Sequence, residues 1–148
     1  MAYRGNKGKF KPSNPHKYRG DYTAIIYRSS WELKFMRECD AHPGIIQWSS
    51  EEVIVPYRSL IDGKKHRYFV DFWVKKEDGV TLVEIKPMSQ SIEPKKSKRV
   101  TKRYIEEVKT WGTNISKWKA AEQYCLDRNW KFMVLTEKGE ATAWRQLI

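Results

Sequence analysis

Asp71, Glu84 and Lys86 are the residues of this 148-residue chain whose types and spacing best suit chemistry. The run DFWVKKEDGVTLVEIK, residues 71–86, predicts two strands joined by a tight turn at Asp78-Gly79. Side chains alternate between the two faces of a strand, so Glu84 and Lys86 project from the same side. A two-residue loop at 78–79 places Asp71 opposite Lys86, and a four-residue loop over 76–79 places it opposite Glu84. Either even count puts all three groups on one face, whereas an odd loop without a bulge separates them.

Two carboxylates and an ammonium group on one sheet face suit a site for a hard cation. Mg²⁺ prefers one or two carboxylates together with waters and phosphate oxygens. In such a site the metal activates water and stabilises charge on a phosphoryl group, while the lysine positions or deprotonates the nucleophile. The spacing by itself is a weak pattern, so the alternative is three polar residues on the wet face of an amphipathic hairpin.

The apolar residues around these three groups predict that both faces of the hairpin are covered. The face with the polar groups also carries Phe69, Trp73 and Leu82. The opposite face carries five more apolar residues, namely Val70, Phe72, Val74, Val83 and Ile85. Nearly continuous hydrophobic runs are typical of a sheet buried on both sides. Because charges embedded in such a run need a partner or a metal, the surroundings favour the cation site.

The elements that must position the hairpin predict an α/β (α+β) domain with a mixed sheet flanked by helices. Strands are expected near residues 45–48, 53–58, 66–74 and 130–136. A helix is expected over Ser30–Ala41, because Ser29 and Glu32 match the capping-box pattern. Glu32 therefore has two candidate roles: it closes the cap, or it is a third acid pointing at the sheet.

Lysine and arginine crowd the segment that follows the second strand of the hairpin. We expect a helix from about residue 95 to 111 and another over 114–128. Positions 95, 99 and 102–103 would share one helical face, which either follows a phosphate backbone or is simply solvated. The residues expected to contact DNA are Lys95, Lys96, Lys98, Arg99, Lys102, Arg103 and Lys119.

The whole chain is strongly basic, with a formal net charge of +11 and a pI near 9.6. This charge predicts attraction to a polyanion, and the length suits one domain with a real core. Residues 1–20 hold six Lys or Arg residues and no acid. We therefore expect a flexible basic arm over 1–22 and a single domain over 23–148. The arm would lie along a phosphate backbone, dock on a protein partner or stay solvated.

Cysteine usage and hydropathy indicate an intracellular, soluble protein. Cys39 and Cys125 lie far apart in expected helices, which predicts buried, reduced thiols and no zinc site. No apolar run approaches the length of a membrane span, and the N-terminus lacks a signal-peptide core.

The order of these features resembles the PD-(D/E)xK nuclease superfamily: a helical Glu, then an Asp, then Glu-x-Lys, then a basic helix and a closing strand. The chain is most similar to the head-completion nucleases of T-even-type tailed phages, and also resembles the end-cleaving endonuclease subunits of heteromeric transposases. The segments that carry the resemblance are 27–32 (YRSSWE), 63–71 (GKKHRYFVD), 83–87 (VEIKP) and 117–121 (KWKAA).

The resemblance implies a restriction-endonuclease-like fold and a metal-dependent DNA endonuclease. It makes Asp71 and Glu84 metal ligands and Lys86 the catalytic lysine. It makes Glu32 an acid that binds the metal or orients the attacking water, and the backbone carbonyl of Ile85 a further oxygen ligand. The chain departs from the pattern where Val70, not proline, precedes the first acid.

The resemblance also implies a cofactor, partners and a place of action. The cofactor is Mg²⁺ or Mn²⁺, the substrate is double-stranded DNA, and phage head or portal proteins are candidate partners. The protein would act late in virion assembly, in the host cytoplasm or in association with the virion, and it is not expected to be secreted. The competing hypothesis is a non-catalytic virion protein that binds DNA or the portal. A third is an RNA-binding module with a plain core hairpin.

Overall fold

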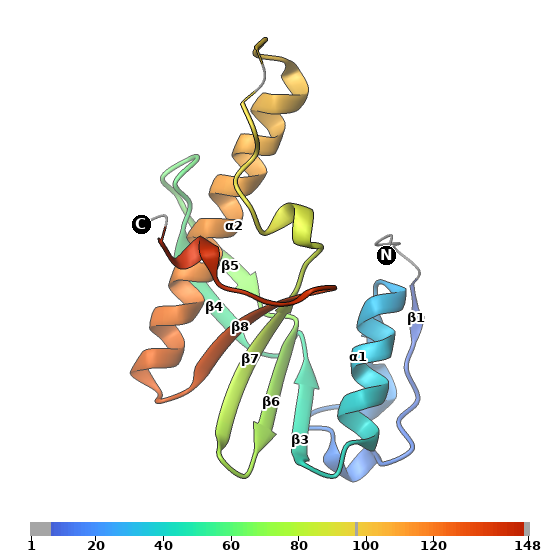
Figure 1. Ribbon diagram of the computed structural model, residues 1–148. Coiled ribbons are helices and arrows are strands. Elements are labelled where there is room, and N and C mark those ends of the chain that lie inside the picture. The colour runs from blue at the N-terminus through green and yellow to red at the C-terminus, as the bar shows by residue number, and fades with distance from the viewer. Residues whose placement is uncertain (1–6, 97, 147–148) are drawn as a thin grey trace.

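A five-stranded mixed sheet forms the centre of the protein in the computed structural model, which describes residues 7–96 and 98–146 (Figure 1). Its strands lie in the spatial order β3-β6-β7-β8-β9. β7 and β8 are parallel, and the other neighbouring pairs are antiparallel. The strands are β3 Ile45–Ser50, β6 Phe72–Lys76, β7 Gly79–Ile85, β8 Lys131–Thr136 and β9 Gly139–Ala141.

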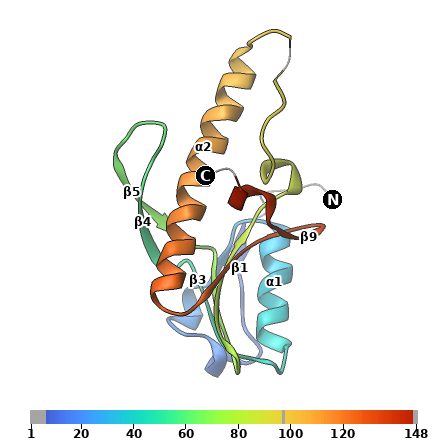
Figure 2. The ribbon, with the colours of Figure 1, turned by 60° about the vertical axis from the view of Figure 1, so that its left-hand side comes forward.

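One long helix covers each face of this sheet. The face with Val83 packs under α1 (Ser30–Ala41), and the face with Leu82 packs under Trp118 of α2 (Lys102–Asp127). Figures 1 and 2 show the sheet between the two helices. The sheet is therefore buried on both sides, as the continuous apolar runs predicted, and the expected mixed sheet flanked by helices is confirmed.

Shorter elements complete the described chain. A two-stranded ribbon of β4 and β5 is separate from the main sheet and stands beside α2 (Figure 2). The bounds are β1 Gly8–Lys9, β2 Ile26–Tyr27, β4 Ile54–Arg58 and β5 Lys65–Phe69, with single 3₁₀ turns at Pro15–Lys17, Tyr22–Ala24, Met88–Gln90 and Ala143–Gln146.

The strand predicted over 66–74 is broken in the middle, so this prediction is wrong. The chain leaves β5 at Phe69 and enters β6 at Phe72, in a different sheet. This break shifts the alternation of side chains by one residue. Val70 is therefore buried in the core under α2, whereas Phe69, expected beside the polar groups, is 45% exposed.

A single helix, α2, occupies the place where two helices were expected. Thr101 is its N-cap, with Oγ1 accepting from the amide of Tyr104 at 3.0 Å. Gly112 lies inside the helix with Ile61 packed close to it: a Cβ on this glycine would be 2.6 Å from Cδ1 of Ile61, whose side chain would have to shift. Residues 95–101 precede the helix, so the predicted basic stripe does not lie on one helical face.

Residues 7–22 pack onto the domain, so the expectation of a flexible arm is wrong for them; the first six residues lie outside the described chain. The ring of Phe10 is buried and meets Trp48 edge-on, with 5.8 Å between centroids. Lys17 donates to two backbone carbonyls at the C-terminal end of α1, at 3.0 and 2.9 Å. A few anchoring side chains thus order a segment whose average composition suggested disorder.

Both cysteines, Cys39 and Cys125, are buried and free, as predicted. Within residues 7–96 and 98–146 no helix is long and apolar enough to cross a membrane.

The docked N-terminal segment makes a testable prediction. Phe10→Ala should lower the free energy of unfolding by about 3 kcal/mol, because it opens a cavity beside Trp48. Phe69→Ala is the matched control and should cost less than about 1 kcal/mol, since its ring is half-exposed. Urea unfolding measures both, and equal losses for the two variants would contradict the docking.

Candidate active site

Asp71 and Glu84 face each other at one end of the β6–β7 hairpin. The two strands pair without interruption up to Lys76 opposite Gly79, so the turn consists of residues 77–78. Continuing this register past the start of β6 places Asp71 opposite Glu84. This is the pairing expected for a loop over residues 76–79, because a turn at 77–78 has the same centre and therefore the same register. The turn lies one residue earlier than the predicted position at Asp78-Gly79. Gly79, with φ +135°, is already the first paired residue of β7.

Asp71 is held by backbone hydrogen bonds at the point where the chain changes sheets. Its carboxylate oxygen Oδ2 accepts from the amide of Ile85 at 2.8 Å. Its own carbonyl accepts from the amide of Glu51 at 3.1 Å. The side chain therefore has a defined position at the end of β7.

The carboxyl groups of Asp71 and Glu84 lie close together, with Glu84 buried and Asp71 partly buried. Burial raises the pKa of Asp71 well above its ordinary value, and the charge of Glu84 and the contact with it raise that pKa further. The hydrogen bond from Ile85 acts in the opposite direction. Two adjacent carboxylates in such surroundings either share a proton or are stabilised by a cation.

Tyr68 fixes the second acid from the side of α2. This residue is buried, and its hydroxyl donates to Oε2 of Glu84. Burial, followed by the charges of Glu84 and Asp71, raises the pKa of the Tyr68 hydroxyl well above 10, so it remains a donor. We did not single out Tyr68 from the sequence. The available signal was its position on the strand that leads into Asp71.

Glu32 lies between the Ser29 cap and the acid pair. Ser29 caps α1, with Oγ accepting from the amide of Glu32 at 3.1 Å, so the predicted cap is confirmed. The carboxylate of Glu32 accepts from the Arg28 amide and from the Ser29 hydroxyl, each at 3.4 Å. Its charge also contributes to the raised pKa of Asp71, so this acid lies near the pair.

Arg28 is a cation at the edge of this acidic group that the sequence analysis missed. Its guanidinium binds both carboxylate oxygens of Glu51, at 2.8 and 3.2 Å. The hydrogen bond and the charge of Glu51 raise the pKa of Arg28, and Glu32 and Asp71 add to this effect. The sequence feature that could have indicated Arg28 is its position directly before the Ser29 N-cap.

Lys86 directly follows β7, two residues after Glu84. Its amide donates to the carbonyl of Leu135 at 3.0 Å, so the pairing with β8 continues to this residue. Strand alternation then places its side chain on the same side as Glu84. The side chain is half-buried, and its ammonium forms no ion pair with any carboxylate in residues 7–96 and 98–146. It is therefore available to an external anion.

The donor set fits a hard divalent cation, although it contains two carboxylates and no third side-chain ligand among the described residues. Across the described chain no group of three or more His, Cys, Asp and Glu side chains is arranged as a metal site. Mg²⁺ needs only one or two carboxylates, because waters and phosphate oxygens complete its coordination. Asp71 and Glu84 meet this requirement, and a cation between them would relieve their repulsion. Glu32 as a metal ligand and the carbonyl of Ile85 stay predictions.

The basic residues predicted to contact DNA lie in two places. Most surround the start of α2, where the helix projects beyond the sheet and its side chains are exposed (Figure 1). Lys119 lies further along α2 and is half-buried. Lys117, which we did not select, is the α2 lysine beside the site, because its Nζ lies 5.5 Å from the ring centroid of Tyr68. Two residues correspond to roughly 200° around a helix, so Lys119 projects from the other side.

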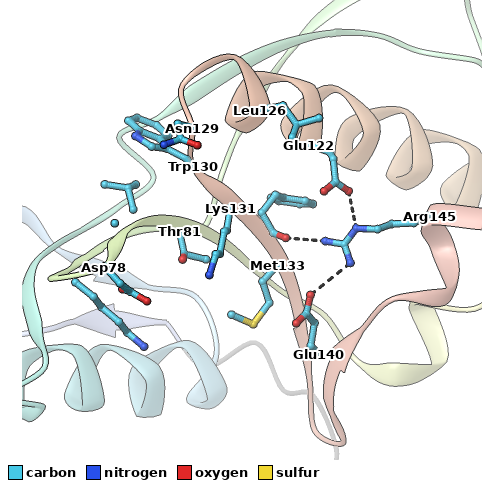
Figure 3. Close-up of a pocket in the computed structure, with 14 residues that line it drawn as sticks. Asp78, Thr81, Glu122, Leu126, Asn129, Trp130, Lys131, Met133, Glu140 and Arg145 are labelled. Carbon is cyan, nitrogen blue, oxygen red and sulfur yellow. Dashed lines mark hydrogen bonds and ion pairs between the residues drawn. The ribbon is translucent and has the colours of Figure 1, made fainter.

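A separate cleft lies at the opposite end of β7, where Gly79 and Thr81 contribute to its wall (Figure 3). Arg145 bridges it, with Nε 2.6 Å from Glu122 and a terminal nitrogen 3.4 Å from Glu140. These contacts anchor the last 3₁₀ turn. Glu122 and Glu140 are both paired with Arg145 and Asp78 is the remaining acid of the lining, so the cleft offers no second pair of free carboxylates.

Comparison with known proteins agrees with this geometry. The sequence profile described as the TnsA-like endonuclease N-terminal domain matches residues 42–137, which include Asp71, Glu84 and Lys86. The head completion nuclease of Enterobacteria phage T4 is 44% identical over 144 residues, covering 94% of this chain and 94% of that protein. No solved structure gave a significant match. The profile spans most of the chain, including the paired acids and the lysine after them, and the protein therefore belongs to the TnsA-like endonuclease family.

Proposed function

We propose that the protein is a DNA endonuclease that hydrolyses phosphodiester bonds with Mg²⁺ or Mn²⁺ bound at Asp71 and Glu84. The observation that carries this proposal is that the buried Glu84 and the partly buried Asp71 lie close together beside a lysine without an ion pair in the described chain. Endonuclease activity follows from the family; the metal and the residue roles are the proposed part.

Each residue of the site has a role in the proposed reaction. A bound divalent ion would supply activation of water and stabilisation of charge on the phosphoryl group. Asp71 and Glu84 would hold the ion, together with the backbone carbonyl of Ile85. Lys86 would steer or deprotonate the attacking water and offset negative charge at phosphorus. Glu32 would orient that water or add a ligand.

DNA would reach the site along a positively charged rim. The exposed cations at the start of α2 supply this rim, and they outnumber the acids there, of which Glu107 is paired with Arg103. Such cations bind phosphates without reading sequence and make affinity depend on salt. Lys117 adds a charge on the same side as Tyr68.

We further propose that the enzyme acts during phage head completion or DNA packaging. The T4 relative carries that name and aligns with nearly the whole chain. Head or portal proteins are the candidate partners, and the host cytoplasm or the virion is the place of action. A structural virion protein without catalysis is the second candidate, but the acids and the lysine are all present, which favours the enzyme.

The catalytic assignment is tested by substituting Asp71 or Lys86. Asp71→Ala and Lys86→Ala should each lower plasmid cleavage at least 100-fold with Mg²⁺ or Mn²⁺, because each removes a group acting on the reacting phosphate. DNA binding and the thermal midpoint should change little for Lys86→Ala. The exposed Lys75→Ala at the far end of β6 is the control. Nicking by Lys86→Ala at the wild-type rate would refute its role.

The contact between Tyr68 and Glu84 predicts weaker metal binding when the hydroxyl is lost. Tyr68→Phe preserves the buried ring but leaves Glu84 without its donor, so we expect divalent-ion affinity to fall on the order of tenfold. Calorimetric titration with Mn²⁺ measures this without a cleavage assay. Tyr57→Phe, in the same core, is the matched control. Unchanged Mn²⁺ affinity in Tyr68→Phe would show that the hydroxyl does not position the ligand.

The raised pKa of Asp71 predicts a pH-dependent stability of the metal-free protein. Because the folded state binds this proton more tightly than the unfolded state, the stabilisation is complete in acid and is lost as pH rises through the folded pKa. Asp71→Asn should therefore raise the melting temperature at pH 8 in EDTA by roughly 3 °C, about 1 kcal/mol. The gain should vanish near pH 4. Asp78→Asn in the exposed turn is the control, and a destabilised Asp71→Asn at pH 8 would contradict the strained pair.

A further inference from the structure

The β4–β5 ribbon presents one face to solvent and buries the other. Its pairing places Ile54 opposite Phe69, Pro56 opposite Arg67 and Arg58 opposite Lys65, and all six side chains are exposed. We call these six residues the outer face of the ribbon. The intervening residues, among them Val55 and Tyr68, point into the core under α2. Figures 1 and 2 show that the ribbon extends away from the main sheet.

The outer face is cationic and carries no acid. Lys65 and Arg67 form no ion pair with a carboxylate anywhere in the described part of the chain. The guanidinium of Arg67 lies 5.5 Å from the ring centroid of Phe69, which keeps it extended over the surface. The nearby acid, Asp62, is bound to His66 at 2.8 Å on the other side of the ribbon. Among residues 7–96 and 98–146, Lys65 and Arg67 therefore have no counterion.

The ribbon is joined directly to the candidate active site. β5 ends at Phe69, two residues before Asp71, and Tyr68 on its inner face contacts Glu84. At about 3.3 Å per residue, Arg67 lies at most roughly 13 Å and Lys65 at most roughly 20 Å from Asp71. Both distances are shorter than one turn of B-DNA, about 34 Å. A duplex cleaved at Asp71 can therefore reach both cations.

We propose that the outer face of the ribbon binds the phosphate backbone of the duplex DNA beside the cleaved bond, with Lys65 and Arg67 as the main contacts. This inference rests on the proposed function. Charge complementarity identifies the occupant, because three cations without an acid match a polyanion. A two-stranded ribbon also has dimensions that fit a DNA groove. The contact is distinct from the cations at the start of α2 and would hold the duplex on a second side.

The experiment is a salt titration of duplex binding by fluorescence anisotropy, with a labelled duplex of random sequence in EDTA to prevent cleavage. The double variant Lys65→Ala/Arg67→Ala should bind roughly tenfold to a hundredfold more weakly at 0.1 M salt. The slope of log K against log salt should fall by about 2. Lys75→Ala/Lys76→Ala is the matched control, because it removes the same net charge from exposed positions at the far end of β6. It should retain nearly the wild-type affinity and slope.

Equal behaviour of the two double variants would overturn the proposal, as would wild-type affinity in Lys65→Ala/Arg67→Ala. Unchanged melting temperatures show that both variants are folded. The binding assay is independent of catalysis: a wild type that binds DNA through the ribbon but never cleaves it would refute the proposed hydrolysis alone. A wild type that cleaves, with a ribbon variant that binds normally, would refute the ribbon contact alone.

Discussion

The hydrogen bond from the Ile85 amide to the Asp71 carboxylate is the contact on which the site depends. It joins the end of β7 to the point where the chain passes from the ribbon into the main sheet. Without it, Asp71 would have no fixed donor to offset the burial and the repulsion from Glu84 that raise its pKa. This backbone donor thus helps to hold two carboxylates close together although their charges repel each other. A pair held in this way is poised for a cation.

Charge is arranged by zone in this molecule. The acids Glu32, Asp71 and Glu84 are gathered at the ends of α1 and the central strands. The cations lie outside this group: Arg28 at its edge, others on the ribbon, and others on the first turn of α2, roughly 20 Å along the helix from Lys117. A chain with a net charge of +11 can therefore attract a polyanion while keeping a negative centre for a metal ion. Tyr68 belongs to both zones, because its hydroxyl contacts Glu84 and its ring lies under Lys117.

Sequence reasoning succeeded where a local pattern determines local structure and failed where distant contacts decide. The capped helix over Ser30–Ala41 was predicted to the residue, since Ser29 and Glu32 carry their own signal. The strand over 66–74 was wrong, because nothing local shows that Val70 pairs with Val53 and leaves the sheet. The prediction of a flexible arm was wrong for residues 7–22, because composition does not reveal that the side chains of Phe10 and Lys17 pack against the domain. Tyr68 was missed for the same reason.

The sequence alone determined the chemical groups and their order: a helical acid, an acid expected on one strand of a hairpin, and Glu-x-Lys on the next strand. Strand alternation required Glu84 and Lys86 to share a face, whatever the fold around them. Only the tertiary structure decided that Asp71 lies opposite Glu84, because the turn register and the change of sheet at Val70 depend on pairing between distant segments. It also decided which cations are exposed beside the site, since a side chain's surroundings come from residues far away in the chain.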